Sequence, residues 1–234
     1  QIRITAQLIE ASSDKHLWSD TYDRQLDNIF EIQDDIAQKI AQALRVRLDL
    51  KQPRVTTTDN VKAYDLYLRG RSFHRKFSLN NLRFAIEMFK KATDVDPNFA
   101  QAWCGLADCH SLLALYLGTG DKDLGAAGDA SQKALLLAPD LAEAHVSRGL
   151  FRVASEQIEE AVQEFARAIE LDPNMPEAQY QMGRVCVHRN ELAKALEWFE
   201  KAIELSPDDF EIPLIAAPIY RSFGQTERAN KADI

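Results

Sequence analysis

The chain has 234 residues, of which 46% are hydrophobic and 27% charged, so it can bury the core of one or two domains, and disorder is excluded as its main state. Asp and Glu outnumber Lys and Arg by 36 to 28. The resulting net charge of −8 excludes general nucleic-acid binding, because most of the surface repels a polyanion. No run of about 18 apolar residues is present, so direct insertion into a membrane is not expected.

The cysteines indicate the compartment. Cys104, Cys109 and Cys186 are odd in number and irregularly spaced, which argues against a disulfide framework. We therefore expect a reducing compartment, the cytoplasm, with the periplasmic face as the alternative if the parent protein has an upstream transmembrane helix. The N-terminus begins at Gln1 without a signal-peptide layout, and we expect the chain to be part of a longer protein.

The first 50 residues predict two strands and a helix. Residues 2–10 alternate apolar and polar side chains and are rich in β-branched residues, as in a half-buried strand. A polar turn and a second strand at about 16–22 complete a predicted hairpin. Isoleucines and leucines then recur every three or four residues, which predicts a helix at about 28–48. Since these elements are too few for an independent domain, residues 1–50 are expected to be the C-terminal part of a small α/β domain.

A polar linker separates this part from the rest of the chain. Residues 51–60 carry Pro53 and three threonines and have no hydrophobic periodicity. We therefore predict a second domain at 61–234.

The second domain contains an internal repeat. Residues 142–175 align with residues 176–209 at an offset of 34 residues. The same residue types recur at fixed places in both copies: Gly149 and Gly183, Ala161 and Ala195, Phe165 and Phe199, Ala168 and Ala202, Pro173 and Pro207. Small residues let two antiparallel helices cross closely, and proline ends the second helix. Each copy is therefore predicted to be a helix, a turn and a second helix.

This pattern resembles the tetratricopeptide repeat (TPR). The resemblance implies a mainly α fold, a right-handed superhelix (α-solenoid) of four full repeats and a partial fifth, at 63–99, 100–141, 142–175, 176–209 and 210–234. The second repeat carries an eight-residue insertion that we place in its turn, where Gly118, Gly120, Gly125 and Gly128 flank 121–123. The apolar run 112–117 is expected to extend the first helix towards it. In the fifth repeat, Pro213 and Pro218 predict a kinked helix, and the chain stops within the second helix.

The N-terminal part also resembles a known family. The stretches LWSDTYDR and NIFEIQDDIAQKIAQAL are similar to the end of the small α/β domain typified by the N-terminal domain of TolB. In bacterial multidomain regulators this domain often precedes a TPR array, with a nucleotide cyclase, protein kinase or winged-helix domain further upstream. The resemblance implies a bacterial signalling or regulatory protein.

The TPR resemblance further implies a concave groove lined by the first helix of each repeat. Its groove places include the second, fifth, ninth, twelfth and thirteenth of each repeat. The candidate groove residues taken from these places are Tyr67, Arg71, His74 and Arg75 in the first repeat, Asp108 (with Cys104) in the second, Val146, Leu150 and Val153 in the third, and Tyr180, Arg184 and His188 in the fourth.

The charge along the array is uneven. Residues 61–99 hold 8 Lys and Arg against 4 Asp and Glu, whereas residues 100–209 hold 9 against 19. A bipolar groove with an apolar middle suits an extended or helical peptide of mixed charge; ordinary solvated charge on a spacer is the alternative. The TPR variety that grips chaperone C-termini needs Lys and Asn at places that Val146, Leu150 and Tyr180 occupy, so that ligand is disfavoured. The end with Arg71 and Arg75 still suits an acidic terminus.

No catalytic or metal-binding motif is recognisable. Cys104, Cys109 and His110 lack the spacing of a zinc or haem site, and we expect Cys109 in the core and Cys104 on the groove face. The glycines form no phosphate-binding loop. We therefore expect no cofactor, no metal and no enzymatic activity within this chain.

These observations favour a non-catalytic scaffold that binds a peptide or partner domain in the TPR groove. The alternative is a regulatory segment of a multidomain enzyme, a nucleotide cyclase or protein kinase, whose catalytic domain lies outside this chain. The open C-terminal end is also expected to support self-association, through the apolar residues Ile212, Leu214, Ile215 and Ile219.

Overall fold

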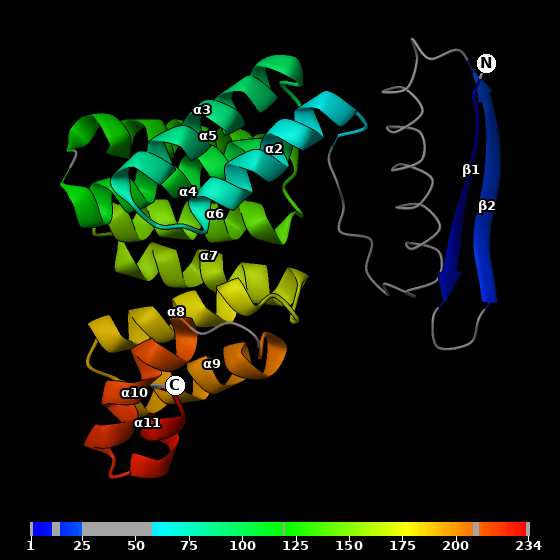
Figure 1. Ribbon diagram of the computed structural model, residues 1–234. Coiled ribbons are helices and arrows are strands. Elements are labelled where there is room, and N and C mark those ends of the chain that lie inside the picture. Colours follow the sequence, from blue (N-terminus) through cyan, green and yellow to red (C-terminus); the bar gives the residue numbers. More distant parts are fainter. Residues whose placement is uncertain (1, 11–14, 25–57, 119, 208–210, 233–234) are drawn as a thin grey trace. The chain divides into compact units, whose positions relative to one another are not determined.

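The structure of the protein is a computed structural model that describes residues 2–10, 15–24, 58–118, 120–207 and 211–232 (Figure 1). The chain divides into two compact units, residues 1–55 and 56–234.

The first unit contains a two-stranded antiparallel sheet. Strands β1 (Ile2–Glu10) and β2 (Lys15–Arg24) pair from Ile2 with Arg24 to Glu10 with Lys15, with a register irregularity between Leu8 and Ile9. Thr5 and Thr21 face each other across the sheet, and their hydroxyl oxygens lie 3.3 Å apart. The predicted turn and the predicted helix at 28–48 lie outside the described residues, so the hairpin as a whole and the TolB-like domain stay predictions.

The second unit is helical, as the repeat pattern predicts. Its described helices are α2 (Val61–His74), α3 (Leu79–Val95), α4 (Ala100–Leu117), α5 (Asp121–Leu137), α6 (Ala142–Ala154), α7 (Ile158–Leu171), α8 (Pro176–His188), α9 (Leu192–Leu205), α10 (Glu211–Ser222) and α11 (Thr226–Ala232). Consecutive helices pack as pairs, and each pair packs on the next, which builds a solenoid (Figure 1). None of these described helices is both long and apolar enough to span a bilayer.

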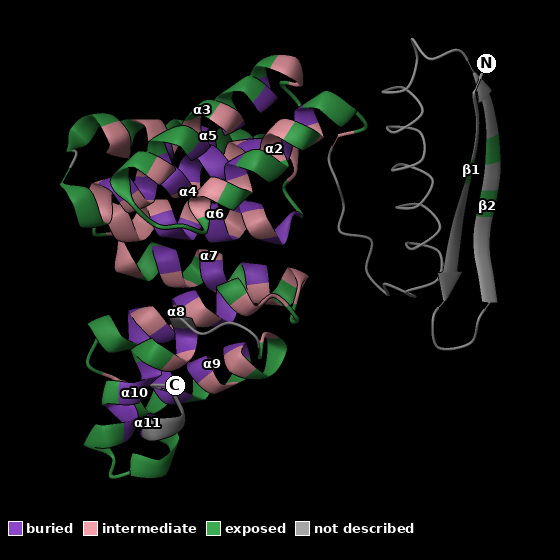
Figure 2. Ribbon diagram, viewed as in Figure 1, coloured by how far each residue is buried: buried purple, intermediate pink, exposed green. Residues whose placement is uncertain are grey.

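One buried phenylalanine closes most of the helix pairs. Phe89, Phe165 and Phe199 come from the second helices α3, α7 and α9 and are almost completely buried. Buried and exposed positions alternate along these helices (Figure 2). Each ring lies against a glycine of the first helix: a Cβ built on Gly183 would lie 2.5 Å from the ring of Phe199. The glycine is needed because the ring occupies the space of a side chain.

The insertion in the second repeat was predicted in the turn, but most of it belongs to the two helices. Helices α4 and α5 contain 18 and 17 residues, against 13 and 14 in α6 and α7, so the insertion lengthens both helices. The apolar residues 112–117 extend α4, as predicted, and Gly118 ends the helix in the left-handed conformation, at φ 60°. Asp121 and Asp123 lie in the first turn of α5, where the positive end of the helix dipole favours acidic side chains. A short contact of 2.6 Å between His110 Nδ1 and Asp123 Oδ1 joins the two extensions.

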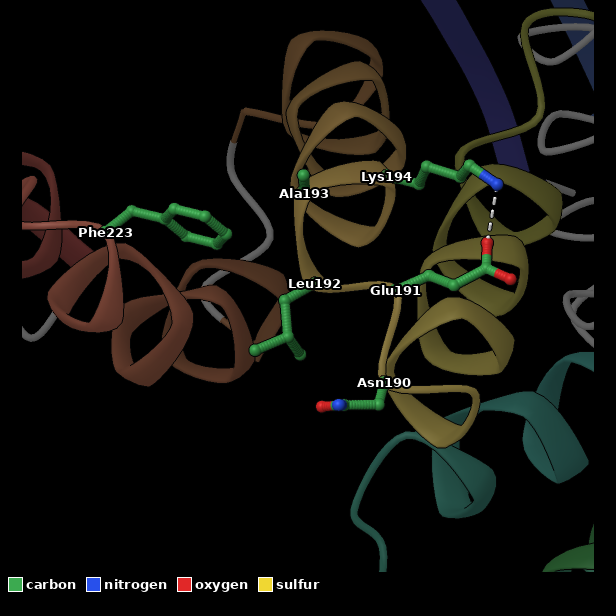
Figure 3. Close-up of a pocket in the computed structure, with 6 residues that line it drawn as sticks. All are labelled: Asn190, Glu191, Leu192, Ala193, Lys194 and Phe223. Atoms are coloured by element: carbon green, nitrogen blue, oxygen red, sulfur yellow. Dashed lines mark hydrogen bonds and ion pairs between the residues drawn. The ribbon is translucent and has the colours of Figure 1, made fainter.

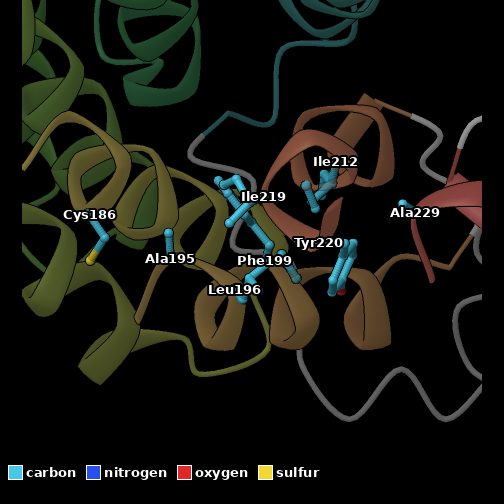
Figure 4. Packing of buried hydrophobic residues seen from close by; sticks show 10 residues of the cluster. Cys186, Ala195, Leu196, Phe199, Ile212, Ile219, Tyr220 and Ala229 are labelled. Carbon is cyan, nitrogen blue, oxygen red and sulfur yellow. The ribbon is translucent and has the colours of Figure 1, made fainter. Parts of the chain in front are cut away.

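Helix α10 is assigned as one helix from Glu211 to Ser222, with Pro218 inside it. Ile212, Ile219 and Tyr220 pack against Leu196 and Phe199 of α9 (Figure 4). Because Ile212 and Ile219 are buried, they do not belong to an exposed C-terminal face, contrary to the prediction. Exposed apolar residues on this helix include Leu214 and Ile215.

Ala161 and Ala195 are fully buried, as predicted for helix crossings. We expect Ala195→Leu to lower the free energy of unfolding by about 1 to 3 kcal/mol, because the added methylenes overpack the core between α8, α9 and α10. Ala193→Leu is the matched control, since Ala193 is exposed on the same helix and should change stability by less than about 0.5 kcal/mol. Urea denaturation measures both variants, and equal costs would contradict this helix register.

Candidate functional site

A row of polar side chains crosses the first helices of the repeats. Arg71 lies on α2, Asp108 on α4, Glu143 on α6 and Glu177 on α8. They lie close enough for the charges of Glu143, Glu177 and Arg71 to shift the pKa of Asp108. We call the surface of α2, α4, α6 and α8 that carries these residues, with Tyr67, Ser147 and Arg184, the first-helix face.

At the α2 end of the first-helix face, Tyr67 hydrogen-bonds and stacks with Arg71. The guanidinium donates a hydrogen bond to the Tyr67 hydroxyl at 3.3 Å, and its central carbon lies 5.9 Å from the centre of the Tyr67 ring. The Tyr67 ring in turn packs against Phe99 at 5.0 Å between ring centres. Burial lowers the pKa of Arg71, but Tyr67, Asp108 and Glu143 together raise it above its ordinary value. Arg71 is therefore a cation that Tyr67 holds in place near the carboxyl groups of Asp108 and Glu143.

His74 and Arg75 end the same helix. His74 is half-buried, whereas Arg75 is exposed. Burial, helped by the charges of Arg71 and Arg75, lowers the pKa of His74 to about 4. The ring is therefore neutral at pH 7, and its Nε2 atom has no hydrogen-bond partner among the described residues.

Asp108 is the centre of the face. Burial raises the pKa of its carboxyl to about 7; Glu177 and Glu143 act in the same direction, whereas a hydrogen bond from Ser147 and the charge of Arg71 oppose the shift. In the described part of the chain, Asp108 Oδ1 and the hydroxyl of the fully buried Ser111 have no hydrogen-bond partner. Unpaired buried polar atoms cost free energy, so this part of the face is unsatisfied by the protein alone.

At the α8 end, Arg184 lies between two tyrosines. Its guanidinium carbon is 5.4 Å from the ring centre of Tyr116 and 5.7 Å from that of Tyr180. The hydrogen bond from its Nη1 to Gln181 Oε1 is long, at 3.4 Å, and Gln181 donates at 2.6 Å to Glu177. Burial lowers the pKa of Arg184.

The third repeat does not supply the apolar groove that was predicted. Val146 and Leu150 are only 4% exposed and belong to the core with Ala161 and Phe165, so neither lines an open surface. The reason is that α6 packs between α4 and α8 and against α5 and α7, which covers the predicted face. Cys104, expected on the groove face, is likewise buried at 4% exposure. Cys109 lies in the core, as predicted.

The other predicted residues are half-buried or exposed: Tyr67, Arg71, His74, Arg75, Asp108, Val153, Tyr180, Arg184 and His188. The sequence reasoning missed Glu143, Glu177 and Tyr116. The two glutamates occupy the second place of their repeats, which is itself a groove place, so the repeat pattern could have found them. Tyr116 lies in the insertion, for which the repeat pattern offers no signal.

A separate surface depression lies away from these residues. Asn190, Glu191, Leu192, Ala193, Lys194 and Phe223 line it, at the turn between α8 and α9 and beside the turn after α10 (Figure 3). An ion pair of 2.8 Å between Glu191 and Lys194 neutralises its charged groups. Across the described residues, no group of three or more His, Cys, Asp or Glu side chains is placed to hold a metal ion.

Comparison with known proteins identifies the repeat. Residues 140–210 match the family model of the tetratricopeptide repeat. Over 110 residues, or 46% of this chain, the sequence is 36% identical to the Rhizobium meliloti (strain 1021) protein named "Putative adenylate cyclase 3". The matched part spans only 19% of that protein.

Two solved structures, one of them of a TPR protein, share the fold. TTC0263, a thermophilic TPR protein of Thermus thermophilus, matches with a TM-score of 0.57 at 18% identity and covers 82% of this chain and 94% of its own. PilF of Pseudomonas aeruginosa matches with a TM-score of 0.53 at 21% identity, over 73% of each chain. The helical unit is therefore an α-solenoid that contains tetratricopeptide repeats.

Proposed function

We propose that the helical unit is a non-catalytic protein-interaction scaffold that binds a partner peptide along the first-helix face. The observation that carries the proposal is a pair of partly exposed residues on α2 and α4 whose side chains each keep an unpaired polar atom: His74 with Nε2 and Asp108 with Oδ1. A peptide backbone supplies donors and acceptors in a row, so its binding would satisfy atoms that the folded chain leaves without partners.

The charges on this face favour a peptide of mixed sign. Asp108 and Glu143 lie near Arg71, and Glu177 lies near Asp108, which gives the centre of the face an acidic character. Arg75 and Arg184 add positive charge at the two ends. A peptide with a basic or amide-rich middle and acidic flanks complements this order, and charge complementarity mainly sets specificity.

Selection from a phage-displayed library of random dodecapeptides tests this proposal. We expect an enriched family of peptides, and we expect Arg71→Ala and Asp108→Asn each to weaken its binding by at least about tenfold, since removing a desolvated charged partner costs about 2 to 5 kcal/mol. Arg83→Ala and Asp129→Asn are the matched controls, because both residues are exposed on the second helices α3 and α5. Failure to enrich any peptide, or equal binding by all four variants, would overturn the proposal.

A second candidate is supported by the relative of the chain. The likeness to a putative adenylate cyclase covers 46% of this chain and 19% of that protein, so the helical unit would be a regulatory segment of a bacterial signalling enzyme. Under this proposal residues 1–50 are the end of the TolB-like domain. Sequencing the gene upstream of the codon for Gln1 tests it: a cyclase or kinase domain supports it, and an unrelated domain contradicts it.

We also propose self-association through the exposed apolar residues Leu214 and Ile215 of α10, which are 47% and 39% exposed. Multi-angle light scattering should then detect a dimer that Leu214→Glu disrupts. A monomer at all concentrations would contradict this proposal.

A further inference from the structure

The lengthened helix α4 makes a contact that skips a repeat. Tyr116 lies in its last turn, in the second repeat, and its ring lies next to Arg184 in the fourth repeat. Helix α6, which lies between them in the stack, ends at Ala154 after 13 residues, whereas α4 has 18. The insertion thus builds an aromatic wall beside Arg184.

This wall is open to solvent. Tyr116 is 46% exposed, and Phe77 packs edge-on against it at 5.7 Å between ring centres while remaining 48% exposed itself. Phe77 lies in the turn between α2 and α3, so the two rings and Arg184 come from three different repeats. A cation and two exposed rings therefore form one continuous surface.

Arg148 and Arg228 also lie over aromatic rings but have further partners, whereas Arg152, over Phe151, resembles Arg184 because its hydrogen bond goes to the amide oxygen of Gln157. Arg148 lies over Phe151 but also donates to the Gly128 carbonyl at 3.2 Å and to Ser131 Oγ at 3.1 Å. Arg228 lies over Tyr220 and pairs with Glu200.

Arg184 has no such compensation. Its guanidinium makes the long hydrogen bond to Gln181, and it forms no ion pair with a described carboxylate within 4.0 Å. A guanidinium carries five N–H donors, so most donors of Arg184 are left for an external acceptor.

We propose, on the basis of the proposed function, that Arg184, Tyr116 and Phe77 form an anion subsite that binds a carboxylate of the partner peptide next to an apolar side chain. The planar carboxylate accepts two parallel hydrogen bonds from the guanidinium, which stays stacked on Tyr116. The apolar side chain covers the exposed rings of Phe77 and Tyr116.

The surrounding charge selects a monoanion. Only one guanidinium is present in the subsite, and the acidic centre of the first-helix face is linked to it through Gln181 and Glu177. A phosphate dianion would therefore meet more repulsion there than a carboxylate, in a protein with a net charge of −8.

Titration of the ¹⁵N-labelled chain with N-acetylphenylalanine tests the subsite without any selected peptide. We expect saturable shifts of the Arg184 Nε–Hε signal and of the amide signals near Tyr116, and binding at least tenfold weaker for N-acetylphenylalanine amide, which lacks the carboxylate. N-acetyl-aspartyl-phenylalanine amide, which offers a side-chain carboxylate instead, distinguishes a terminal from a side-chain source. Binding of inorganic phosphate as tight as that of the carboxylate would overturn the assignment.

Variants localise the effect. Arg184→Gln and Tyr116→Ala should each weaken N-acetylphenylalanine binding at least fivefold, whereas Arg148→Gln, which removes a stacked but compensated arginine, should not. Circular dichroism shows whether each variant is folded. If Arg184→Gln does not fold, Tyr116→Ala still tests the subsite. Unchanged binding in both subsite variants would overturn the inference. This outcome is distinct from failure of the peptide selection, which would overturn the proposed function while leaving the fragment titration intact.

Discussion

Replacing Phe165 by alanine should lower the free energy of unfolding by about 3 to 5 kcal/mol. The ring is completely buried between α6 and α7, where it contributes to the core of the third repeat. Its removal loses hydrophobic burial and leaves a cavity that the stacked helices cannot fill by collapse. Phe84→Ala is the control, because Phe84 is 49% exposed on α3 and should cost less than about 1 kcal/mol. Similar costs in urea denaturation would contradict this core.

The partner of Phe165 provides a stricter test. A Cβ on Gly149 would collide with the Phe165 ring, so Gly149→Ala is strongly destabilising only while that ring is present. In a double-mutant cycle, the cost of Gly149→Ala should fall by about 1 to 3 kcal/mol when Phe165 is already alanine. Additive costs would show that the glycine and the ring are not in contact.

Asp108→Asn should change how stability depends on pH. The carboxyl has a pKa of about 7 in the folded chain, against an ordinary value of 3.8. Between these values the folded protein keeps a proton that the unfolded chain has lost. The contribution of Asp108 is therefore full below about pH 4 and is lost as the pH rises through about 7, by at most about 4 kcal/mol. Asparagine does not ionise, so the variant does not lose this stability as the pH rises. The free energy of unfolding of the variant should therefore increase relative to that of the wild type from pH 4 to pH 8.

The difference between the two proteins is the quantity to measure. His74, with a pKa of about 4, acts in the opposite direction, because its contribution is present above pH 6.5 and is lost as the pH falls through 4. The contribution of His74 cancels in the comparison of Asp108→Asn with the wild type. Urea denaturation at pH 5 and pH 8 should show the growing difference, and Asp129→Asn, at an exposed position, should show none. A constant difference for Asp108→Asn would contradict the raised pKa of this carboxyl.

The repeat core was predictable because its spacing is set by helix geometry. Glycine, alanine and phenylalanine recur at the places where two helices cross, and these places do not depend on the rest of the molecule. The extension of α4 by 112–117 was predicted, but the extension of α5 was missed because four glycines indicated a turn, and Gly125 and Gly128 are helical instead. The leucines before them and the aspartates after them allow both helices to grow instead.

The candidate site was only partly predictable. Arg71, Asp108 and Arg184 lie at groove places, and the structure leaves them at least partly accessible. Val146 and Leu150 lie at such places too, but the packing of α6 on four neighbouring helices buries them, and the burial of a helix face depends on its neighbours. The contact of Tyr116 with Arg184 depends on the length of α4 and the stacking of three repeats, which no single repeat encodes.

Photo-crosslinking tests most directly that the first-helix face is the binding surface. A library-selected peptide carrying benzoylphenylalanine at successive positions is irradiated with the full chain, and mass spectrometry locates the adducts. We predict adducts on accessible residues of α2, α4, α6 and α8, such as Arg75, Val153 and Val187. Adducts confined to the second helices α3, α5, α7 and α9 would contradict the account.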